Sequence, residues 1–246
     1  MITERKHMAK NQSKRPALSI VIPAYNEEST IEEVLKAVHA ALLPTIEVIV
    51  VDDGSKDDTR KILKRLEKKY ISKLIFRKKN GGKGAALRDG IQHATGSFVV
   101  IQDADLEYDP NDLPMVLQPL LSGRADVVYG SRFMGSAAHR VVYFWHYLAN
   151  MSLTTLSNIF NNINLTDMET GYKMFKREIL QDITITENAF GIEPEITAKI
   201  AHKNLRMYEV GISYHGRTYE EGKKIGLKDA FRAVWVIVKF GILLKL

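Results

Sequence analysis

The feature that most constrains the fold of this chain of 246 residues is a regular alternation of strand-like and helix-like hydrophobic patterns. Short apolar runs rich in β-branched residues indicate strands at 18–22, 46–51, 74–76, 98–101 and 126–129. Apolar residues at helical spacing separate them in the segments 31–42, 57–66, 84–94 and 111–122. Strands that alternate with helices of this length imply crossover connections. We therefore predict an α/β fold with a mainly parallel central sheet flanked by helices.

The second half of the chain is less regular. Its patterns indicate a long helix at 141–163, a short strand at 174–175, a helix at 193–203 and a strand at 206–214. It contains no internal repeat, low-complexity tract or clear linker, and the length fits one large domain or two small ones. We expect this half to complete the sheet and to supply the site of a second substrate.

Composition narrows the classes of function. The chain has no cysteine, which excludes disulfides, thiolate metal sites and a cysteine nucleophile and is compatible with a reducing cytoplasm. A net charge of +6 favours anionic partners such as nucleotides, phosphorylated lipids, acidic membrane surfaces or nucleic acid. We expect no nucleic-acid partner, because aromatic RNA-binding motifs are absent and the basic residues are dispersed.

The two ends of the chain differ from its middle. Residues 1–16 are polar and basic, which predicts a disordered leader, either solvated or lying on an anionic surface. Residues 230–246 predict a helix that is apolar almost all round but interrupted by Arg232, Lys239 and Lys245, and no segment reaches the ~18 to 20 apolar residues of a membrane span. Two interpretations stay open for it: a helix lying on a membrane surface with basic anchors and an interfacial Trp, or one packed on the domain or a second subunit.

Polar clusters follow three of the predicted strands, at 23–27, 52–55 and 103–105. In parallel sheets the carboxyl ends of the strands share one edge, and ligands bind beyond it, so we expect the clusters to form a single site. Asp103 and Asp105 in the third cluster can face one another across a cation. Mg²⁺ and Mn²⁺ prefer such oxygen ligands and commonly share them with substrate phosphates.

Seven motifs in a fixed order carry a family resemblance. They are LSIVIPAYNE at 18–27, VVDDGSKDDT at 50–59, NGGKGA at 80–85, DADLE at 103–107, GSR at 130–132, TGYK at 170–173 and EPEITAK at 193–199. Together they resemble a family 2 glycosyltransferase with the GT-A (Rossmann-like) fold, over residues 17–229. Within that family the chain is most similar to the dolichyl-phosphate and polyprenyl-phosphate sugar transferases, and RTYEEGKKIG at 217–226 supports this subgroup.

The resemblance implies a first group of nucleotide-sugar contacts. Pro23, Tyr25 and Glu27 match the first nucleotide-contacting loop of the family. Asp52 matches the acid that accepts hydrogen bonds from the nucleobase, and Val50 would line the base pocket.

Two neighbouring features have ordinary structural alternatives. We expect Asp58 to cap the following helix, and leave Asp53 open between capping and nucleotide contact. The glycines at 81–84 resemble a phosphate loop without the Gly-Lys-Ser/Thr ending of a P-loop, and Lys83 among them would supply charge to the nucleotide. The alternative for this segment is a flexible turn between strand and helix.

The acidic motif at 103–107 is expected to hold the metal and the ribose. By the resemblance, Asp105 is the metal ligand and Glu107 assists it, whereas Asp103 and Ala104 contact the nucleotide sugar. The cofactor is a divalent metal, Mg²⁺ or Mn²⁺, which would stabilise the departing nucleoside diphosphate.

Cations are the expected phosphate-binding groups of the second half. Arg132 and Arg140 are the candidates for gripping donor or acceptor phosphates, because a guanidinium matches phosphate geometry, and we assign them with Asp105 to catalysis. Arg217, Lys223 and Lys224 would close over the pyrophosphate. The alternative for these residues, weakest for Arg132, is a role as solvated surface charges.

The resemblance implies an inverting transferase that moves mannose or glucose from GDP-mannose or UDP-glucose to a dolichyl or undecaprenyl phosphate. We expect it on the cytoplasmic face of a membrane as a peripheral protein, as a homo-oligomer or with a membrane-protein partner. The alternative is a family 2 enzyme with a sugar hydroxyl as acceptor, for which Glu193 or Glu195 would be the base. In the first reading we expect these two acids to have structural roles.

Overall fold

The computed structural model describes residues 17–135, 140–141, 143–189, 191–216 and 227–244. The predicted leader 1–16 and three predicted phosphate-binding residues, Arg217, Lys223 and Lys224, lie outside the described residues.

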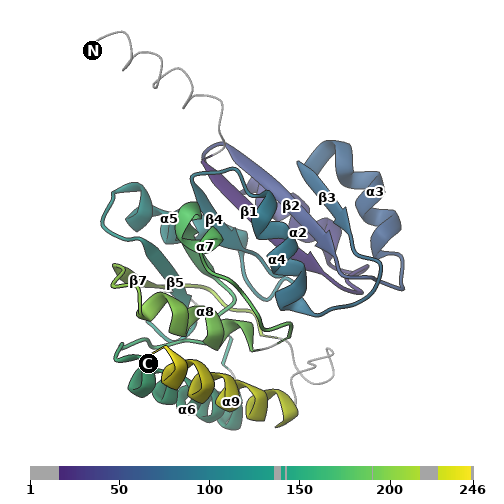
Figure 1. Cartoon of the computed structure of the whole chain (residues 1–246). Coiled ribbons are helices and arrows are strands. Elements are labelled where there is room, and N and C mark those ends of the chain that lie inside the picture. Colours follow the sequence, from purple (N-terminus) through teal and green to yellow (C-terminus); the bar gives the residue numbers. More distant parts are fainter. Residues whose placement is uncertain (1–16, 136–139, 142, 190, 217–226, 245–246) are drawn as a thin grey trace, which may run out of the picture.

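Seven described strands form one sheet in the order β3-β2-β1-β4-β6-β5-β7 (Figure 1). The strands are β1 (Leu18–Ala24), β2 (Ile46–Asp52), β3 (Lys73–Phe76), β4 (Phe98–Ile101), β5 (Val127–Ser131), β6 (Lys173–Lys176) and β7 (Met207–Gly211). The helices are α2 (Ile31–Ala40), α3 (Thr59–Tyr70), α4 (Lys83–His93), η1 (Pro110–Asp112), α5 (Leu113–Leu121), α6 (Phe144–Asn161), α7 (Arg177–Gln181), α8 (Ile192–Ala201) and α9 (Leu227–Leu243). The predicted α/β architecture is confirmed.

Strand direction decides which loops share an edge of the sheet. β1 pairs in parallel with β2 and β4, and β2 with β3, so their carboxyl ends lie at one edge, called here the rim. β6 runs antiparallel to both β4 and β5, which returns β5 to the direction of β4. The carboxyl end of β5 and the amino end of β6 therefore reach the rim as well. This places residues 170–172 beside the loops that follow β1, β2 and β4.

Apolar residues bury the sheet on both faces. One core cluster joins the sheet to α2, α3 and α5, and the other joins it to α4, α7 and α8. Figure 1 shows α6 and α9 side by side, on the far side of α8 from the sheet. Burial of this apolar surface is the main stabilising contribution, at about 25 cal/mol per Å².

Several boundaries differ from the sequence prediction for local physical reasons. α3 begins at Thr59, and its backbone N–H donates to Asp57 Oδ1 (3.1 Å); the expected cap by the Asp58 side chain is not formed. The single predicted helix at 111–122 is η1 followed by α5, because Pro110 and Pro114 each begin a turn. α7 and the antiparallel direction of β6 were not predicted.

α9 packs on the domain with one side and leaves the other exposed. Val236 and Ile237 are fully buried against α6 and α8, whereas Phe231 is 76% and Trp235 60% exposed. Within the described ranges, no helix combines the length and hydrophobicity needed to cross a bilayer.

Candidate active site

The loops after β1 and β2 are joined by hydrogen bonds at the rim. Asn26, at a left-handed φ of 56°, donates its backbone N–H to Ser55 Oγ (3.0 Å), and its side-chain oxygen accepts from the backbone of Lys56 (2.9 Å). Glu27 donates its backbone N–H to Thr59 Oγ1 (2.8 Å). Pro23, Tyr25 and Glu27 all remain partly exposed. The structure thus brings the two predicted nucleotide loops together and leaves the first of them accessible.

Asp52 and Asp53 are buried and occupied by donors from the protein. Asp52 accepts from Arg60 Nε (2.6 Å) and from the backbone of Gly54 and Ser55. Val50 is fully buried in the core beneath it. In this structure Val50 packs the core and Asp52 organises its own turn; the contacts of both residues with a nucleobase stay predictions.

Asp53 anchors the segment 80–84, called here the donor loop. Its carboxylate accepts from Arg77 Nη1 (2.5 Å), Gly82 N (2.7 Å) and Gly81 N (3.0 Å). Gly82 has a φ of 90°, and a Cβ there would lie 2.2 Å from the carbonyl oxygen of Asn188. Glycine is therefore required at this position. Asp53 therefore holds the donor loop and does not cap α3, and its contact with a nucleotide stays a prediction.

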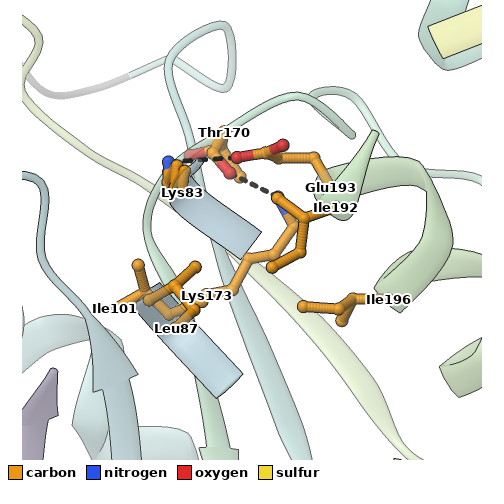
Figure 2. Close-up of a pocket in the computed structure, with 9 residues that line it drawn as sticks. Lys83, Leu87, Ile101, Thr170, Lys173, Ile192, Glu193 and Ile196 are labelled. Carbon is orange, nitrogen blue, oxygen red and sulfur yellow. Dashed lines mark hydrogen bonds and ion pairs between the residues drawn. The ribbon is translucent and has the colours of Figure 1, made fainter. Parts of the chain in front are cut away.

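Lys83 links the donor loop to two acids from other elements. Its Nζ lies 2.9 Å from Asp103 Oδ1, after β4. It also lies 3.0 Å from Glu193 Oε1, on α8 (Figure 2). Burial alone lowers the pKa of Lys83, but the two carboxylates outweigh it and hold that pKa well above its ordinary value. Lys83 is therefore a fixed cation beside the acidic motif. Ala104, next in the chain after Asp103, is buried.

Residues 103–107, called here the acidic turn, project two further carboxylates. Leu106 adopts a left-handed φ of 60°, and the Glu107 backbone N–H donates to Asp105 Oδ1 (3.2 Å). Tyr214 Oη donates to Glu107 Oε2 (2.9 Å) from the segment after β7. Both acids are partly exposed. The structure places the two predicted metal ligands on one tight turn at the rim.

The donor set fits a hard divalent cation that shares its ligands with a substrate. Asp105 and Glu107 carry partly exposed carboxylates, and the third acid of the turn, Asp103, pairs with Lys83. Among the described residues no three His, Asp or Glu side chains gather closely enough to hold a metal by themselves. Mg²⁺ and Mn²⁺ are commonly bound by one or two carboxylates plus substrate phosphates, which matches this arrangement.

Arg132 and Arg140 both lie near Tyr214, but Arg132 forms an ion pair with a buried acid, whereas Arg140 is exposed. Arg132 donates from Nε and Nη2 to the buried carboxylate of Asp167 (2.7 and 2.8 Å), and its guanidinium lies 5.2 Å from the Tyr214 ring. Burial alone would lower its pKa, but Asp167 raises it well above the ordinary value. Arg140 is exposed; its backbone N–H donates to Tyr214 O (2.8 Å) and its Nη1 to Gly216 O (3.1 Å).

A buried ionic cluster behind Lys83 was missed by the sequence analysis. Lys83, Lys173 and Glu193 help to line a cavity of about 10 Å³ (Figure 2). This is close to the smallest volume that holds one water molecule. Glu169, which precedes β6, interacts electrostatically with Glu193 and Lys173. Glu169 Oε1 and Glu193 Oε2 have no hydrogen-bond partner among the described residues.

Two residues of this cluster have pKa values far from their ordinary values. Burial, and then the charge of Glu193, raise the pKa of Glu169 to about 8, while burial lowers the pKa of Lys173 to about 8. The only sequence signal was TGYK at 170–173, which marked the segment without marking Glu169. Glu195, by contrast, has the structural role expected of it: it accepts from the backbone of Thr186 (2.8 Å) and Glu187 (2.7 Å).

The rim can therefore bind a polyanion. It presents a lysine fixed at the start of α4, two partly exposed carboxylates suited to a cation, and an exposed arginine beside a tyrosine. These are the groups that recognise phosphates directly and through a metal.

Comparison with known proteins agrees with this arrangement. The sequence profile of glycosyl transferase family 2 matches residues 19–184. Solved structures of glucosyl-3-phosphoglycerate synthase from Mycobacterium tuberculosis share the fold: one superposes with a TM-score of 0.71 at 21% identity, over 94% of this chain and 81% of that one. The fold and its rim define a GT-A type α/β protein. The chain belongs to glycosyltransferase family 2.

Curated relatives cover much of the chain. An uncharacterized protein of Methanocaldococcus jannaschii is 31% identical over 83% of this chain and 93% of its own length. The dolichol-phosphate mannosyltransferase of Pyrococcus furiosus is 29% identical over 92% of this chain and 67% of its own length. A hexosyltransferase of low-salt glycan biosynthesis from Haloferax volcanii is 28% identical over 92% of this chain but 53% of its own length.

Proposed function

We propose that this protein is a metal-dependent, inverting hexosyltransferase that transfers mannose or glucose from a nucleotide sugar to a polyprenyl phosphate at a membrane surface. The donors we consider are GDP-mannose and UDP-glucose. The proposal goes beyond family membership in naming the acceptor, the metal and the location, and each of these has its own support.

One observation carries the choice of acceptor. Arg140, held beside Tyr214 at the rim, is followed by an exposed apolar segment that enters α6. Val141 is 91%, Phe144 65% and Trp145 74% exposed. A cation adjoining exposed apolar side chains suits a molecule with a phosphate head and a hydrocarbon chain. A free sugar acceptor has neither a phosphate nor a hydrocarbon chain to place there.

The donor is assigned to the other side of the acidic turn. Asp105 and Glu107 would hold the metal, and Lys83 would add a positive charge beside the diphosphate. The bound cation acts as a Lewis acid that stabilises the negative charge of the leaving group. Pro23, Tyr25 and Glu27, partly exposed on the neighbouring loop, would contact the nucleoside. Ala104 would contribute only its backbone, because its side chain is buried.

The chemistry needs alignment more than proton transfer. A phosphate oxygen of the acceptor forms a bond to the anomeric carbon, while the bond from that carbon to the nucleoside diphosphate breaks and the diphosphate takes the electron pair. The nucleophile is already anionic, so no general base is required, and attack opposite the leaving group inverts the anomeric configuration. Arg140 would place the acceptor phosphate. Arg132, fixed by Asp167, would shape its surroundings through Tyr214.

The α6–α9 face supports contact with an anionic membrane. Residues 144–161 of α6 contain no Asp, Glu, Lys or Arg. On α9, Phe231 and Trp235 are exposed, and the charged residues over 230–243 are Arg232 and Lys239, both cationic. Interfacial Trp side chains with basic neighbours are typical of helices that lie on bilayer surfaces. The cytoplasmic face is proposed because nucleotide sugars and cysteine-free chains are both compatible with that compartment.

Relatives support the proposal without deciding it. The Pyrococcus furiosus relative is named a dolichol-phosphate mannosyltransferase, which favours the lipid acceptor. The Mycobacterium tuberculosis synthase was solved with Mn²⁺, UDP and glucosyl-3-phosphoglycerate, and another structure holds Mg²⁺ and UDP. Those ligands are consistent with a divalent metal at the acidic turn. They also make a small phosphorylated acceptor a necessary control.

One observation favours the alternative, a sugar hydroxyl acceptor. Such an acceptor needs a base, and Glu193 has a buried oxygen without a partner among the described residues. Its other oxygen pairs with Lys83, however, and the raised pKa of neighbouring Glu169 marks the region as unfavourable to additional negative charge. A large loss of rate in Glu193→Gln, with none in Arg140→Gln, would favour the hydroxyl acceptor.

The deciding experiment is a transfer assay with matched acceptors. Radiolabelled GDP-mannose and UDP-glucose are incubated with Mg²⁺ or Mn²⁺ and either a short polyprenyl phosphate, 3-phosphoglycerate or a polyprenol without phosphate. We expect labelled lipid from the polyprenyl phosphate alone. Transfer to phosphoglycerate or to the unphosphorylated polyprenol, with none to the polyprenyl phosphate, would reject the proposed acceptor. Undiminished transfer by Asp105→Ala would reject the metal assignment.

A further inference from the structure

Glu187 is a buried acid that the proposed reaction does not use. It lies in the segment 184–189, called here the strap, which runs between α7 and α8. Glu187 is 4% exposed, so its carboxylate must be balanced by nearby charge. Both balancing cations come from α9: Arg232 Nη2 lies 2.6 Å from Oε2, and Lys239 Nζ 3.7 Å from Oε1.

The backbone of the strap contacts the donor loop on its other side. The Gly84 N–H donates to Asn188 O (2.9 Å). A Cβ at Gly84 would lie 2.2 Å from Glu187 O, which leaves no room for another residue there. The strap therefore forms a wall directly against the first turn of α4, from which Lys83 reaches the acidic turn.

Two more residues keep the strap rigid. Arg88 on α4 donates from Nη1 to Glu187 O (3.1 Å) and from Nη2 to the Asn188 side chain. Glu195 accepts the backbone N–H of Glu187 (2.7 Å). The strap is thus bonded to α4 on one side and to α9 on the other.

We propose that Glu187 is a positioning residue that ties the donor loop to α9, so that the placement of α9 sets the affinity of the site for a nucleoside diphosphate. The inference rests on the proposed function in taking the donor loop as the place of the diphosphate. It adds a role for α9 that does not depend on which acceptor is used.

The test removes the charge of Arg232, of Glu187 or of both, and compares the effects on nucleotide binding. GDP and UDP binding with Mg²⁺ is measured by calorimetry for wild type, Arg232→Gln, Glu187→Gln and the double variant. Arg232→Gln leaves a buried carboxylate short of its closest cation, and we expect a dissociation constant raised about tenfold. The double variant should lose less than the sum of the two single changes, since Glu187→Gln removes the buried charge that Arg232→Gln leaves short of a partner. Lys203→Gln, which breaks the exposed pair with Asp182, is the matched control and should leave the affinity unchanged.

Hydrogen exchange tests the connection between α9 and the donor loop without a bound nucleotide. In Arg232→Gln the amides of Gly84 and the next turn of α4 should exchange faster than in wild type, and the double variant should be intermediate. If both single variants bind nucleotide within about twofold of wild type and keep these amides protected, the tie is rejected, even if their melting temperatures fall. If wild type binds neither nucleotide, the proposed function fails, and the exchange rates alone decide whether Glu187 joins α9 to the donor loop.

Discussion

Two acidic strand-end segments, 52–53 and 103–107, look alike in sequence and differ in the structure. Asp52 and Asp53 are buried, and arginines and backbone N–H groups occupy their carboxylates. Asp105 and Glu107 are partly exposed on a tight turn at the rim. The first pair stabilises two loops of the protein. We propose that the second pair binds the metal.

The difference shows how one residue type serves two purposes at one rim. A buried carboxylate supplied with several donors stabilises a loop conformation and offers little to a substrate. A partly exposed carboxylate keeps oxygens within reach of solvent and of a metal. Asp103 stands between these cases, because it is paired with Lys83 yet adjoins the exposed acids. The four predictions that follow test this contrast, from the largest effect to the smallest.

Asp105→Ala should abolish most transfer without unfolding the protein. The proposed metal loses its main protein ligand, and we expect a drop in kcat/KM of about 1,000-fold, comparable to removing a principal electrostatic contact in a transition state. The melting temperature should change little, because the side chain is partly exposed. Activity within tenfold of wild type at saturating metal would contradict the proposed role.

Asp53→Ala should act on stability instead. It leaves Arg77 Nη1 and the N–H groups of Gly81 and Gly82 without their acceptor, and we expect the free energy of unfolding to fall by about 3 kcal/mol. Urea denaturation measures this. Asp89→Ala removes the more exposed partner of the same Arg77 and should cost less than about 1 kcal/mol. Equal losses of unfolding free energy in Asp53→Ala and Asp89→Ala would contradict the structural role given to the buried Asp53.

Arg140→Gln should affect only the acceptor. We expect the KM for a polyprenyl phosphate to rise about tenfold, the loss of one charge-assisted contact, with the KM for the nucleotide sugar unchanged. Exposed Arg124, remote from the rim at the end of α5, serves as the control through Arg124→Gln. A parallel rise in both KM values would place Arg140 on the donor side.

Glu169 should give the folded protein a distinctive pH dependence. Its pKa is raised from the ordinary 4.5 to about 8, so the folded state holds a proton that the unfolded chain releases. The resulting stability is present in full below pH 4.5 and is lost as the pH rises through about 8. We expect the melting temperature of wild type to fall more steeply than that of Glu169→Gln between pH 5 and pH 8. Parallel curves for the two proteins would contradict the raised pKa.

The sequence predicted the first half of the molecule well, because its information is local. Ile20 and Ile22, like Val48 and Val50, stand in continuous apolar runs rich in β-branched residues, which indicate buried strands, and parallel pairing then places their following loops together. The rim followed from that pairing. Boundaries were off by a few residues where prolines or side-chain caps decided them.

The second half resisted prediction for a physical reason. β6 begins with Lys173, a lysine that hydropathy assigns to the surface but that is 1% exposed, with Nζ bound to the carbonyl oxygen of Met168 (2.9 Å) and to that of Thr170. The ionic cluster joins Lys83, Glu169 and Glu193 from three distant segments, so no window of sequence contains it. Such contacts depend on the tertiary fold, and local patterns carry no record of them.

The insertion of β6 between β4 and β5 has a consequence for synthesis of the chain. β1 to β4 can pair as they leave the ribosome, but the outer edge of β4 has no partner until residues 173–176 have been made. A ribosome adding about 5–20 residues per second therefore leaves an apolar strand edge open for several seconds. Nascent chains stalled before residue 173 should be aggregation-prone and bind chaperones, whereas chains released just beyond β7 should not.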